Sequence, residues 1–469
     1  MSHDLLIAGA GAAGMFAALA AAHRGQSVLL LERDLYGPSN LKVSGGLFPG
    51  AGTRMQQEAG VQDSAEQFAA DIHNKASGAV DSDVLHAIAG ASAECVHFLA
   101  DEVGLQVALL ADLNAPGHSA PRLHATPGQS GRELHALLRE AVGKHQAITL
   151  LADAEVTDLV VAEGAIPHVT GARIRVAGAV QSFSSRAVLL ATGGFAANPA
   201  LLAQYIPEMR GALHIGAGAN DGCAVRWGRA LGADVAFMEG YQGQGHVNPP
   251  DGRTRLGMAL PPQGAFMVNR LGRRFVAEDI GPSELAAHVL AQAGGVALEV
   301  FDARIHQFAM AQGPYREAFA AGKILSASSA TDLARLFNIP EREFLASFEQ
   351  HHQAVQSGHD AAHGRKRFGP PLQAPFYGAW VTGALAHTQG GLRVDRCARV
   401  LRTDGSVVPG LYAAGGAAAS VSGVGGAGYL PGNGLAQSFA LALLAARHVA
   451  ARHAGVTALP ALQKSRPPA

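Results

Sequence analysis

Residues 4–32, DLLIAGAGAAGMFAALAAAHRGQSVLLLE, carry the strongest fold signal in the chain. The apolar run before Gly9 predicts a buried strand, and the alanine-rich run up to Gly25 predicts a helix that ends at a glycine. SVLLL then predicts a second buried strand. A strand, a helix and a strand in about thirty residues form the βαβ unit of a parallel sheet. The sequence therefore predicts an α/β fold with a Rossmann-like, doubly wound sheet.

The turn between the first strand and the helix has the spacing Gly9-Ala-Gly11-Ala-Ala-Gly14. Gly9 permits the tight turn, Gly11 lets a diphosphate approach the backbone, and Gly14 lets the helix pack closely on the strand. Glu32 ends the second strand, where a carboxylate can accept hydrogen bonds from ribose hydroxyls. These residues predict a dinucleotide site for FAD or NAD rather than NADP.

The overall composition excludes several other classes of protein. The chain has 469 residues, 48% of them hydrophobic and 16% charged, with a net charge of −1, so nothing favours nucleic acid or an anionic membrane surface. Cys95, Cys223 and Cys397 are far apart, so we expect neither disulfides nor a metal site. The chain runs directly into a strand, without a basic leader or an uninterrupted membrane span. We therefore expect a soluble, cytoplasmic protein.

A change in amino-acid composition along the chain predicts how it is divided into domains. Prolines cluster near residues 249–262 and polar helical segments follow, whereas the glycine-rich apolar character returns after Pro375. We expect one domain in two sequence segments, 1–240 and 373–469, with a second, α+β domain inserted at 241–372.

Three further glycine clusters predict close backbone approach to a ligand. They are Ser44-Gly45-Gly46, the strand end at Thr192-Gly193-Gly194, and the block from His387 to Gly434. The last block ends at a predicted helix start, whose positive dipole would stabilise a reduced flavin ring. NAD needs no second glycine-rich half of this kind, so FAD is favoured.

These motifs together resemble the soluble flavoproteins of the fumarate reductase and succinate dehydrogenase family, close to the 3-ketosteroid dehydrogenases. The resemblance rests on GAGAAG with Glu32, SGG, ATGGF, NDGCAVRWGRALGAD, LGRRFVAED, HTQGGLRVD and LRTDGSVVPGLYAAG, in that order. It implies a split FAD domain, a capping domain and hydride exchange between flavin N5 and a substrate carbon. The flavin contacts that it implies are Gly9, Gly11, Gly14, Glu32, Ser44, Gly45, Gly46, Thr192, Gly193, Asp221, Gly415, Gly432 and Asn433.

Two departures from the family pattern bear on how the implied FAD is bound. Family members with covalent FAD attach it through a histidine beside the SGG-like loop, and here Lys42 and Val43 stand there. Noncovalent FAD is therefore implied. Gly416 stands where many members have a glutamate after AAG, which removes one flavin contact.

The substrate side departs from the fumarate reductases. Those enzymes carry an acid arginine just after RFxxE, but the turn at 279–283 has none, and Tyr429 replaces their carboxylate-clamping arginine. A phenol cannot reproduce bidentate arginine–carboxylate pairing. A tyrosine here is similar to the ketosteroid-type members. His387 matches the family's substrate-facing histidine in HTxGG, and His246, in GQGHVNP, resembles the family's other one, so the resemblance implies that Tyr429, His387 and His246 are catalytic. The sequence alone also allows Tyr429 to be a structural anchor and each histidine to be a core residue.

We therefore expect an FAD-dependent oxidoreductase of CH–CH groups that dehydrogenates or reduces a carbon–carbon bond next to a carbonyl, with a 3-ketosteroid-like or enone substrate. One alternative is a 2-enoate or dicarboxylate reductase using Arg253, Arg255 or Arg393 as its clamp. Another is a flavin-binding protein without catalysis. The sequence has no haem-attachment CxxCH and no cluster cysteines, so the electron donor or acceptor is a separate, unknown partner.

Overall fold

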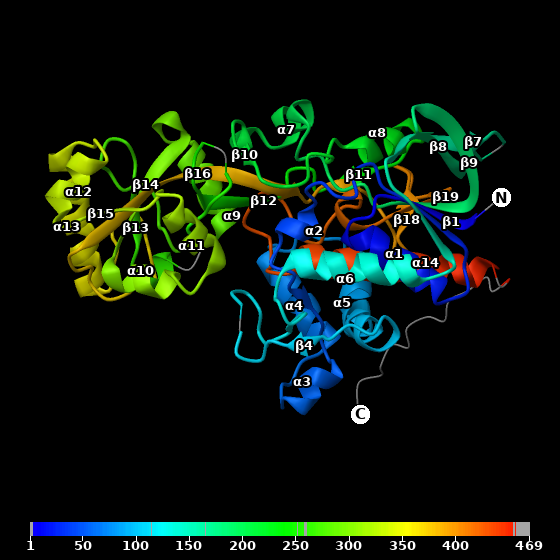
Figure 1. Cartoon of the computed structure of the whole chain (residues 1–469), viewed down its shortest axis with the longest axis horizontal. Helices are drawn as coiled ribbons and strands as arrows, with labels where there is room; N and C mark the ends of the chain where they lie inside the picture. The colour runs from blue at the N-terminus through cyan, green and yellow to red at the C-terminus, as the bar shows by residue number, and fades with distance from the viewer. Residues whose placement is uncertain are drawn as a thin grey trace.

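The computed structural model describes residues 3–113, 115–164, 166–250, 252–257, 260–453 and 455. Figure 1 shows two bodies joined by the long strand β16 (Phe376–Thr388). The body on the right carries the N-terminus and most of the helices, and the body on the left is built from the middle of the chain.

The right-hand body is organised around an eight-stranded sheet with the main order β18-β19-β9-β1-β2-β6. Four neighbouring pairs of this path, from β19-β9 to β2-β6, are parallel, as the βαβ signal predicts. β7 and β8 form an antiparallel extension next to β9. The strands are β1 (His3–Ala8), β2 (Val28–Leu31), β6 (Ile148–Leu151), β7 (Ala154–Ala162), β8 (His168–Val176), β9 (Ala179–Leu190), β18 (Arg399–Leu401) and β19 (Val407–Ala413).

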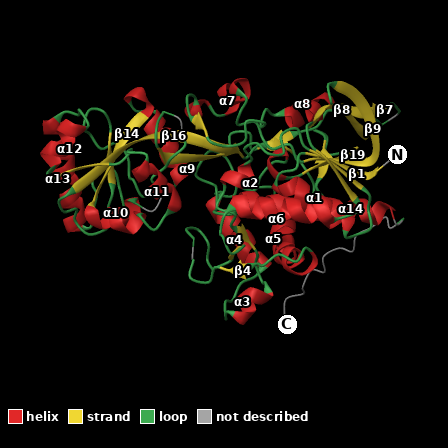
Figure 2. Ribbon diagram, viewed as in Figure 1, coloured by secondary structure: helices red, strands yellow, loops and turns green. Residues whose placement is uncertain are grey.

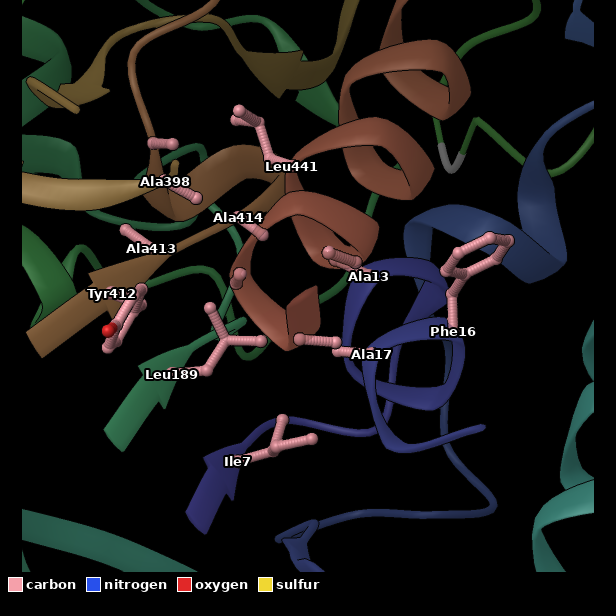
Figure 3. Packing of buried hydrophobic residues seen from close by; sticks show 14 of the residues in the cluster. Ile7, Ala13, Phe16, Ala17, Leu189, Ala398, Tyr412, Ala413, Ala414 and Leu441 are labelled. Atoms are coloured by element: carbon pink, nitrogen blue, oxygen red, sulfur yellow. The ribbon is translucent and has the colours of Figure 1, made fainter. Parts of the chain in front are cut away.

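Helices α1 (Ala12–Ala22) and α14 (Asn433–His453) pack side by side against this sheet (Figure 3). Alanines on α1 allow the close approach, and Phe16 stacks on Phe439 with ring centroids 4.7 Å apart. Two segments from opposite ends of the chain thus share one hydrophobic core. By length and composition α14 could cross a membrane, but 67% of its apolar window is buried in the protein, as in a core helix.

A helical layer lies below the sheet in Figures 1 and 2. It contains the small sheet β3-β5-β4, which lies close to the start of α14. Its elements are α2 (Asn40–Val43), β3 (Phe48–Pro49), α3 (Arg54–Glu58), α4 (Ala65–Lys75), α5 (Ser82–His97), β4 (Ala108–Leu109), β5 (Leu123–Ala125) and α6 (Gly131–Lys144).

The left-hand body is built on a six-stranded sheet with the path β10-β16-β14-β13, to which β12 and β15 add by pairing with β16. It has its own hydrophobic cluster, which extends from Leu256 to Val381. The remaining elements between the two bodies and within this one are α7 (Pro199–Tyr205), β10 (Leu213–His214), α8 (Cys223–Ala230), β11 (Val235–Ala236), β12 (Tyr241–Val247), β13 (Phe266–Val268), α9 (Pro282–Leu290), β14 (Val296–Asp302), α10 (Ala303–Ala309), α11 (Gly313–Ala320), β15 (Leu325–Ala327), α12 (Ala330–Leu336), α13 (Glu341–Ser357) and β17 (Gly391–Leu392).

The expected α/β fold is confirmed in its central features. The strand–helix–strand unit of residues 4–32 is present as β1, α1 and β2. The last predicted helix is α14, and the polar helices predicted before residue 357 are α12 and α13. The sequence patterns did not indicate that β16 would run from one body into the other.

Candidate functional site

The glycine turn after β1 has the backbone geometry that its spacing predicts. Gly9 has φ +102°, and a Cβ there would lie 2.5 Å from the Ala191 carbonyl oxygen. A Cβ on Gly14 would lie 1.8 Å from the Gly9 oxygen. At Gly11, by contrast, a Cβ would meet no described atom within 4 Å, and Gly11 caps α1 without a side-chain hydrogen bond. Two glycines are thus required by packing and the third faces open space at a helix N-terminus, which fits a diphosphate.

Glu32 lies beside this turn at the end of β2. Its Oε2 accepts a hydrogen bond from the Ala10 amide at 2.7 Å, and its Oε1 accepts one from the Asp34 amide at 3.0 Å. These contacts hold the carboxylate next to the glycine turn. A carboxylate fixed at this strand end can still accept hydrogen bonds from ribose hydroxyls through its remaining lone pairs.

The SGG loop packs against the start of α6. The Ser44 hydroxyl donates to the Leu41 carbonyl at 2.8 Å and accepts from the Gly46 amide at 3.1 Å. Gly46 has φ +68°, and a Cβ there would lie 2.6 Å from the Ser130 backbone. A Cβ on Gly45 would meet only Leu47, at 3.7 Å, so the outer side of Gly45 is open.

The end of β9 brings two further predicted residues close to β1. A Cβ on Gly193 would lie 2.1 Å from Asn220 Oδ1. The buried Thr192 hydroxyl lies beside the Cys223 thiol, a weak donor, and makes no other hydrogen bond within the described residues. Thr192 therefore keeps hydrogen-bonding capacity at a strand end that faces the glycine turn.

Asp221 lies farther along the same edge and lines a cavity of about 190 Å³ with Arg33 and Thr157. Its Oδ2 lies 3.5 Å from Arg33 Nη1, and its Oδ1 accepts from the Cys223 amide at 2.9 Å. This polar cavity adjoins the residue that follows Glu32, so it extends the site away from the glycine turn.

The carboxy-terminal glycines close the other side of the site. Gly415, at φ +61°, lies against Ala13 of α1, and Gly432, at φ +87°, lies against Pro49 and Leu123. Asn433 begins α14 and is buried; its Nδ2 donates weakly to Ser422 at 3.4 Å, while its Oδ1 accepts no hydrogen bond from the part of the chain that the structure describes. A buried, unused acceptor is costly unless a ligand donor reaches it. The open backbone at Gly11 and this acceptor both fit FAD.

His387 and Tyr429 meet at the start of α14. Their ring centroids are 5.7 Å apart in an edge-on arrangement. A Cβ on Gly434 would lie 3.6 Å from the Tyr429 hydroxyl and 3.7 Å from His387 Nε2. The absence of a side chain at Gly434 therefore leaves space between the two polar groups.

Burial makes both of these groups neutral near pH 7. Both side chains are half-buried. Burial lowers the pKa of His387 to about 4, partly opposed by the Thr388 carbonyl. Burial also raises the pKa of the Tyr429 phenol to about 12, opposed by the Gly434 and Gly432 amides. The pair can donate and accept hydrogen bonds without carrying charge.

His246 has a different environment. It lies on β12 with its Nδ1 2.9 Å from Glu299 Oε2, and both side chains are buried. Its Nε2 forms no hydrogen bond with any residue that the structure describes. β12 pairs with β16 so that Gln242, not His246, lies opposite His387. The two predicted histidines are therefore on neighbouring strands but not at the same position along them.

The turn at 279–283 leads directly into α9, which begins at Pro282. The Ser283 hydroxyl accepts from the Gly243 amide at 3.0 Å, and a Cβ on Gly426 would touch Ser283. This helix start therefore lies at the junction of the two bodies, near the segment that leads to Tyr429, and it presents no arginine there.

Two neighbours of His387 were not predicted from the sequence. Gln389 is buried, and its Nε2 lies 3.5 Å from His387 Nδ1. The Thr388 hydroxyl accepts from the Phe195 amide at 3.0 Å and so ties β16 to the end of β9. Both residues belong to the HTQGG motif. Their polar side chains next to His387 were the sequence signal that could have predicted them. In the described part of the chain, no cluster of three His, Cys, Asp or Glu residues could hold a metal ion.

Comparison with known proteins gives a consistent result. The family model described as an FAD binding domain matches residues 4–435. A probable fumarate reductase of Shewanella frigidimarina is 29% identical over 462 residues, which cover 96% of this chain and 75% of that protein. The vinyl phenol reductase of Lactiplantibacillus plantarum is 27% identical over 487 residues, 96% of each protein. The NADH:fumarate oxidoreductase of Klebsiella pneumoniae is 28% identical, but this chain spans only 48% of it.

Solved structures agree with this assignment. The open conformation of a flavocytochrome c3 fumarate reductase has a TM-score of 0.83 at 27% identity, covering 97% of this chain and 78% of that chain. A 3-ketosteroid Δ1-dehydrogenase from Sterolibacterium denitrificans has a TM-score of 0.81 at 21% identity, covering 96% and 100%, which shows a shared fold. The resemblance stated from the motifs is confirmed. This chain belongs to the family of the FAD binding domain, and it is an FAD-dependent oxidoreductase that acts on carbon–carbon bonds.

Proposed function

We propose that this chain dehydrogenates or reduces a carbon–carbon bond next to a carbonyl group, with Tyr429 and His387 facing the substrate. The observation that carries the proposal is their meeting across Gly434, at the start of α14 and beside Asn433. FAD, when bound, supplies a hydride acceptor or donor at its N5 atom. The same segment thus brings polar groups for the substrate next to residues proposed to hold the cofactor.

Tyr429 polarises the substrate carbonyl or moves the proton on the neighbouring carbon. Its phenol is protonated at neutral pH, because burial raises its pKa to about 12, so it donates a hydrogen bond without adding charge. A positioned acid or base of this kind contributes roughly 10²–10⁴-fold to rate. His387, with a pKa of about 4, is a neutral partner that accepts or donates according to its tautomer.

His246 is a second substrate contact in this proposal. Glu299 occupies its Nδ1 at 2.9 Å and fixes the orientation of the ring. A ring held in this way presents its Nε2 in one direction, as histidines do when a carboxylate holds the other nitrogen.

The substrate is proposed to be neutral or singly charged and mostly apolar. No arginine stands in the turn at 279–283, and Tyr429 occupies the place of the clamp used for dicarboxylates. The structural similarity to enzymes named for 3-ketosteroids, including one in complex with 1,4-androstadiene-3,17-dione, supports a ketone substrate.

FAD is proposed to bind noncovalently, because Lys42 and Val43 offer no histidine beside the SGG loop. Residues 241–372 are proposed to cap the flavin and exclude water, which strengthens hydrogen bonds at the site. We further propose a cytoplasmic location and a separate electron partner. Relatives named NADH:fumarate oxidoreductase and fumarate reductase (cytochrome) support small redox carriers or proteins in that role.

The second candidate is a 2-enoate or dicarboxylate reductase, favoured by the names of several relatives. It needs a cationic clamp. Arg393 lies 3.2 Å from Asp234 and 3.8 Å from Asp81, so it is already paired. Arg255 is half-buried beside Val247 on β12, close in sequence to His246, and is the better remaining clamp.

One experiment separates these functions. Purified protein should be yellow and release intact FAD on denaturation, and stopped-flow absorbance should follow the flavin band against saturated ketones, enones, 2-enoates and fumarate. A fast response to ketones or enones supports the main proposal, and fast oxidation of the reduced flavin by fumarate supports the second. A flavin that responds to no compound of this panel contradicts both and leaves the protein as a flavin-binding protein.

A further inference from the structure

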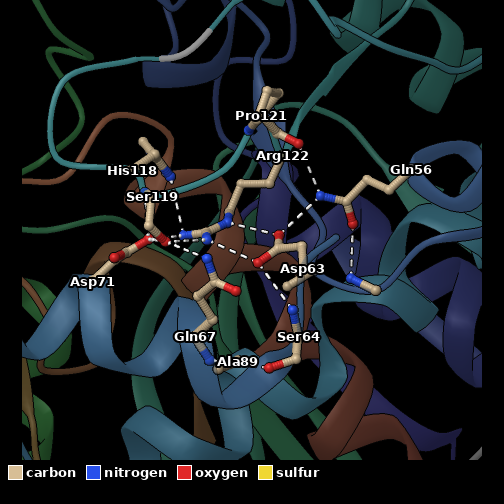
Figure 4. Close-up of polar contacts among 12 residues, drawn as sticks. Gln56, Asp63, Ser64, Gln67, Asp71, Ala89, His118, Ser119, Pro121 and Arg122 are labelled. Carbon is tan, nitrogen blue, oxygen red and sulfur yellow. Dashed lines mark hydrogen bonds and ion pairs between the residues drawn. The ribbon is translucent and has the colours of Figure 1, made fainter. Parts of the chain in front are cut away.

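A buried ion-pair cluster lies in the helical layer next to the site (Figure 4). The fully buried Arg122 guanidinium donates through Nε and Nη2 to the two oxygens of Asp63, each at 2.9 Å. Its Nη1 donates to Asp71 Oδ2 at 2.5 Å, and its Cζ lies 4.8 Å from the centroid of the Phe68 ring. A bidentate pair with a second carboxylate is rigid, because each charged group has fixed partners.

His118 links this cluster to the segment that carries Tyr429. Its Nδ1 lies 3.3 Å from Arg122 Nη1, and its Nε2 lies 2.9 Å from the Pro431 carbonyl oxygen. An arginine can only donate, so Nδ1 accepts and the ring proton is on Nε2, from which it is donated to Pro431. Burial also lowers the pKa of His118, so the ring is neutral at pH 7. The cluster thus selects one tautomer and aims its donor at one carbonyl.

The chain around His118 holds the residues on both sides of Pro431 as well. A Cβ on Gly117 would lie 2.8 Å from Leu430 Cδ1, and a Cβ on Gly432 would lie 3.0 Å from Leu123 Cδ2. Three consecutive residues are therefore in contact with the segment 117–123. The residue before them is Tyr429, and the residue after them is Asn433.

Such an anchor is needed because the backbone just before Tyr429 is only weakly restricted in conformation. Gly423, Gly425, Gly426 and Gly428 precede Tyr429, and glycine restricts the backbone least. The hydrogen bond at Pro431 ties the chain, two residues after Tyr429, to a rigid cluster outside this segment.

We propose that His118 is a positioning residue, which fixes the segment 429–433 through the Pro431 carbonyl and so keeps the Tyr429 phenol beside His387. The proposal rests on the role of Tyr429 in the proposed function. It adds that the rate at the flavin depends on a histidine that touches neither substrate nor cofactor.

Two matched variants separate the hydrogen bond from the polar contact with Arg122. His118→Gln places an amide near the position of Nε2 and can still donate to Pro431. His118→Asn places its amide near Nδ1, beside Arg122, and is too short to reach Pro431. If His118→Asn does not retain FAD, His118→Phe replaces it, because the phenyl ring keeps the stacking on Phe68.

The first measurement needs no substrate. Hydrogen exchange of the FAD-bound protein is followed by mass spectrometry over residues 429–434. His118→Asn should speed exchange there several-fold while His118→Gln stays near wild type, because only Asn loses the anchor. Exchange in His118→Asn that equals wild type, or in His118→Gln that equals His118→Asn, overturns the proposal.

The second measurement tests coupling to Tyr429, with the fastest ketone or enone of the panel above. His118→Asn should slow the flavin step about ten-fold at saturating substrate, because a small misplacement of a reacting group is costly. In a Tyr429→Phe background the same change should have no further effect, whereas independent, multiplying losses overturn the proposal. If Tyr429→Phe alone keeps the wild-type rate, the proposed role of Tyr429 fails, and the exchange data still decide whether His118 fixes the segment.

Discussion

Two histidine environments along β16 differ in kind. Beside the middle of β16, His246 on β12 is paired with the buried Glu299 at 2.9 Å. At the carboxyl end of β16, the hydrogen bonds of the His387 ring to described residues are long, at 3.4 Å to Thr388 and 3.5 Å to Gln389, and the ring faces Tyr429. A histidine in a sequence motif can therefore have a ring that a short hydrogen bond fixes or a ring that only long contacts hold. The surrounding groups decide which, because they fix or leave free each ring nitrogen.

The regions around the two histidines are also stabilised by different contacts. The His246–Glu299 pair lies against the hydrophobic cluster of the left-hand body, whose strands β14 and β16 are paired along their length. The end of β16 that carries His387 is held by Thr388, whose hydroxyl accepts a hydrogen bond from the Phe195 amide after β9. Loss of the Glu299 carboxylate should therefore act mainly on stability, and loss of the Tyr429 hydroxyl mainly on rate.

The largest expected effect is acid destabilisation. Burial lowers the pKa of His387, His124, His135 and His351 to about 4 each, so the unfolded chain binds more protons than the folded one between pH 6.5 and 4. Stability therefore falls as the pH drops through this window and levels off below it, by up to roughly 3 kcal/mol for one such histidine. Urea unfolding at pH 7.5 and pH 5 measures the loss.

His387→Asn removes one of these groups and should make the dependence on pH shallower. An unchanged slope would mean that the His387 ring is well solvated. The rate at the flavin should not titrate with His387 or Tyr429 between about pH 5 and pH 11, since their pKa values lie near 4 and 12.

The second-largest effect is expected at the buried pair of His246 and Glu299. Glu299→Ala should lower the free energy of unfolding by about 3 kcal/mol, because it leaves the His246 Nδ1 buried without a partner. Thermal unfolding of the FAD-bound protein measures the loss. His246→Asn is the matched control: its amide can replace Nδ1 and keep Glu299 paired, but it has no counterpart of Nε2. A stable His246→Asn protein with wild-type rate would remove His246 from the substrate contacts.

Tyr429→Phe should lower the rate of the flavin step about 100-fold while leaving FAD content and thermal stability unchanged, because only the hydroxyl is lost. Stopped-flow absorbance of the flavin band gives the rate. The control is Tyr412→Phe, whose hydroxyl lies 2.8 Å from His448, away from His387, and which should keep the wild-type rate. A Tyr429→Phe protein as fast as the Tyr412→Phe control would make Tyr429 a structural anchor.

The smallest effect is expected at Gly434. An alanine Cβ there would lie at ordinary contact distances, 3.6 and 3.7 Å, from Tyr429 and His387, so the fold tolerates it. Because alanine favours helix, stability should rise by up to about 1 kcal/mol. The methyl group narrows the space between the two rings, so KM should rise a few-fold with little change in kcat. A KM equal to wild type would indicate that substrate does not enter this space.

The geometry of the glycine turn after β1 was largely predictable from the sequence, because most of its signals are local. Gly14 needs glycine for a contact with Gly9 inside the βαβ unit, and Glu32 follows the second strand of that unit, beside the Ala10 amide. Gly9 needs glycine for a contact with Ala191 after β9, which lies far away in the sequence. The substrate side was less predictable. That His246 would be occupied by Glu299, 53 residues later, depends on the pairing of β12 and β14 with β16.

The sequence by itself determined the α/β class, the strand–helix–strand unit and the absence of an arginine at position 429. Each of these follows from residue type and spacing over a few turns of chain. Only the tertiary structure decided which groups surround those residues: His387 across Gly434 from Tyr429, Glu299 behind His246, and Arg122 with His118 behind Pro431. These contacts join segments that are far apart in the chain, and burial then keeps His387, Tyr429 and His118 neutral near pH 7.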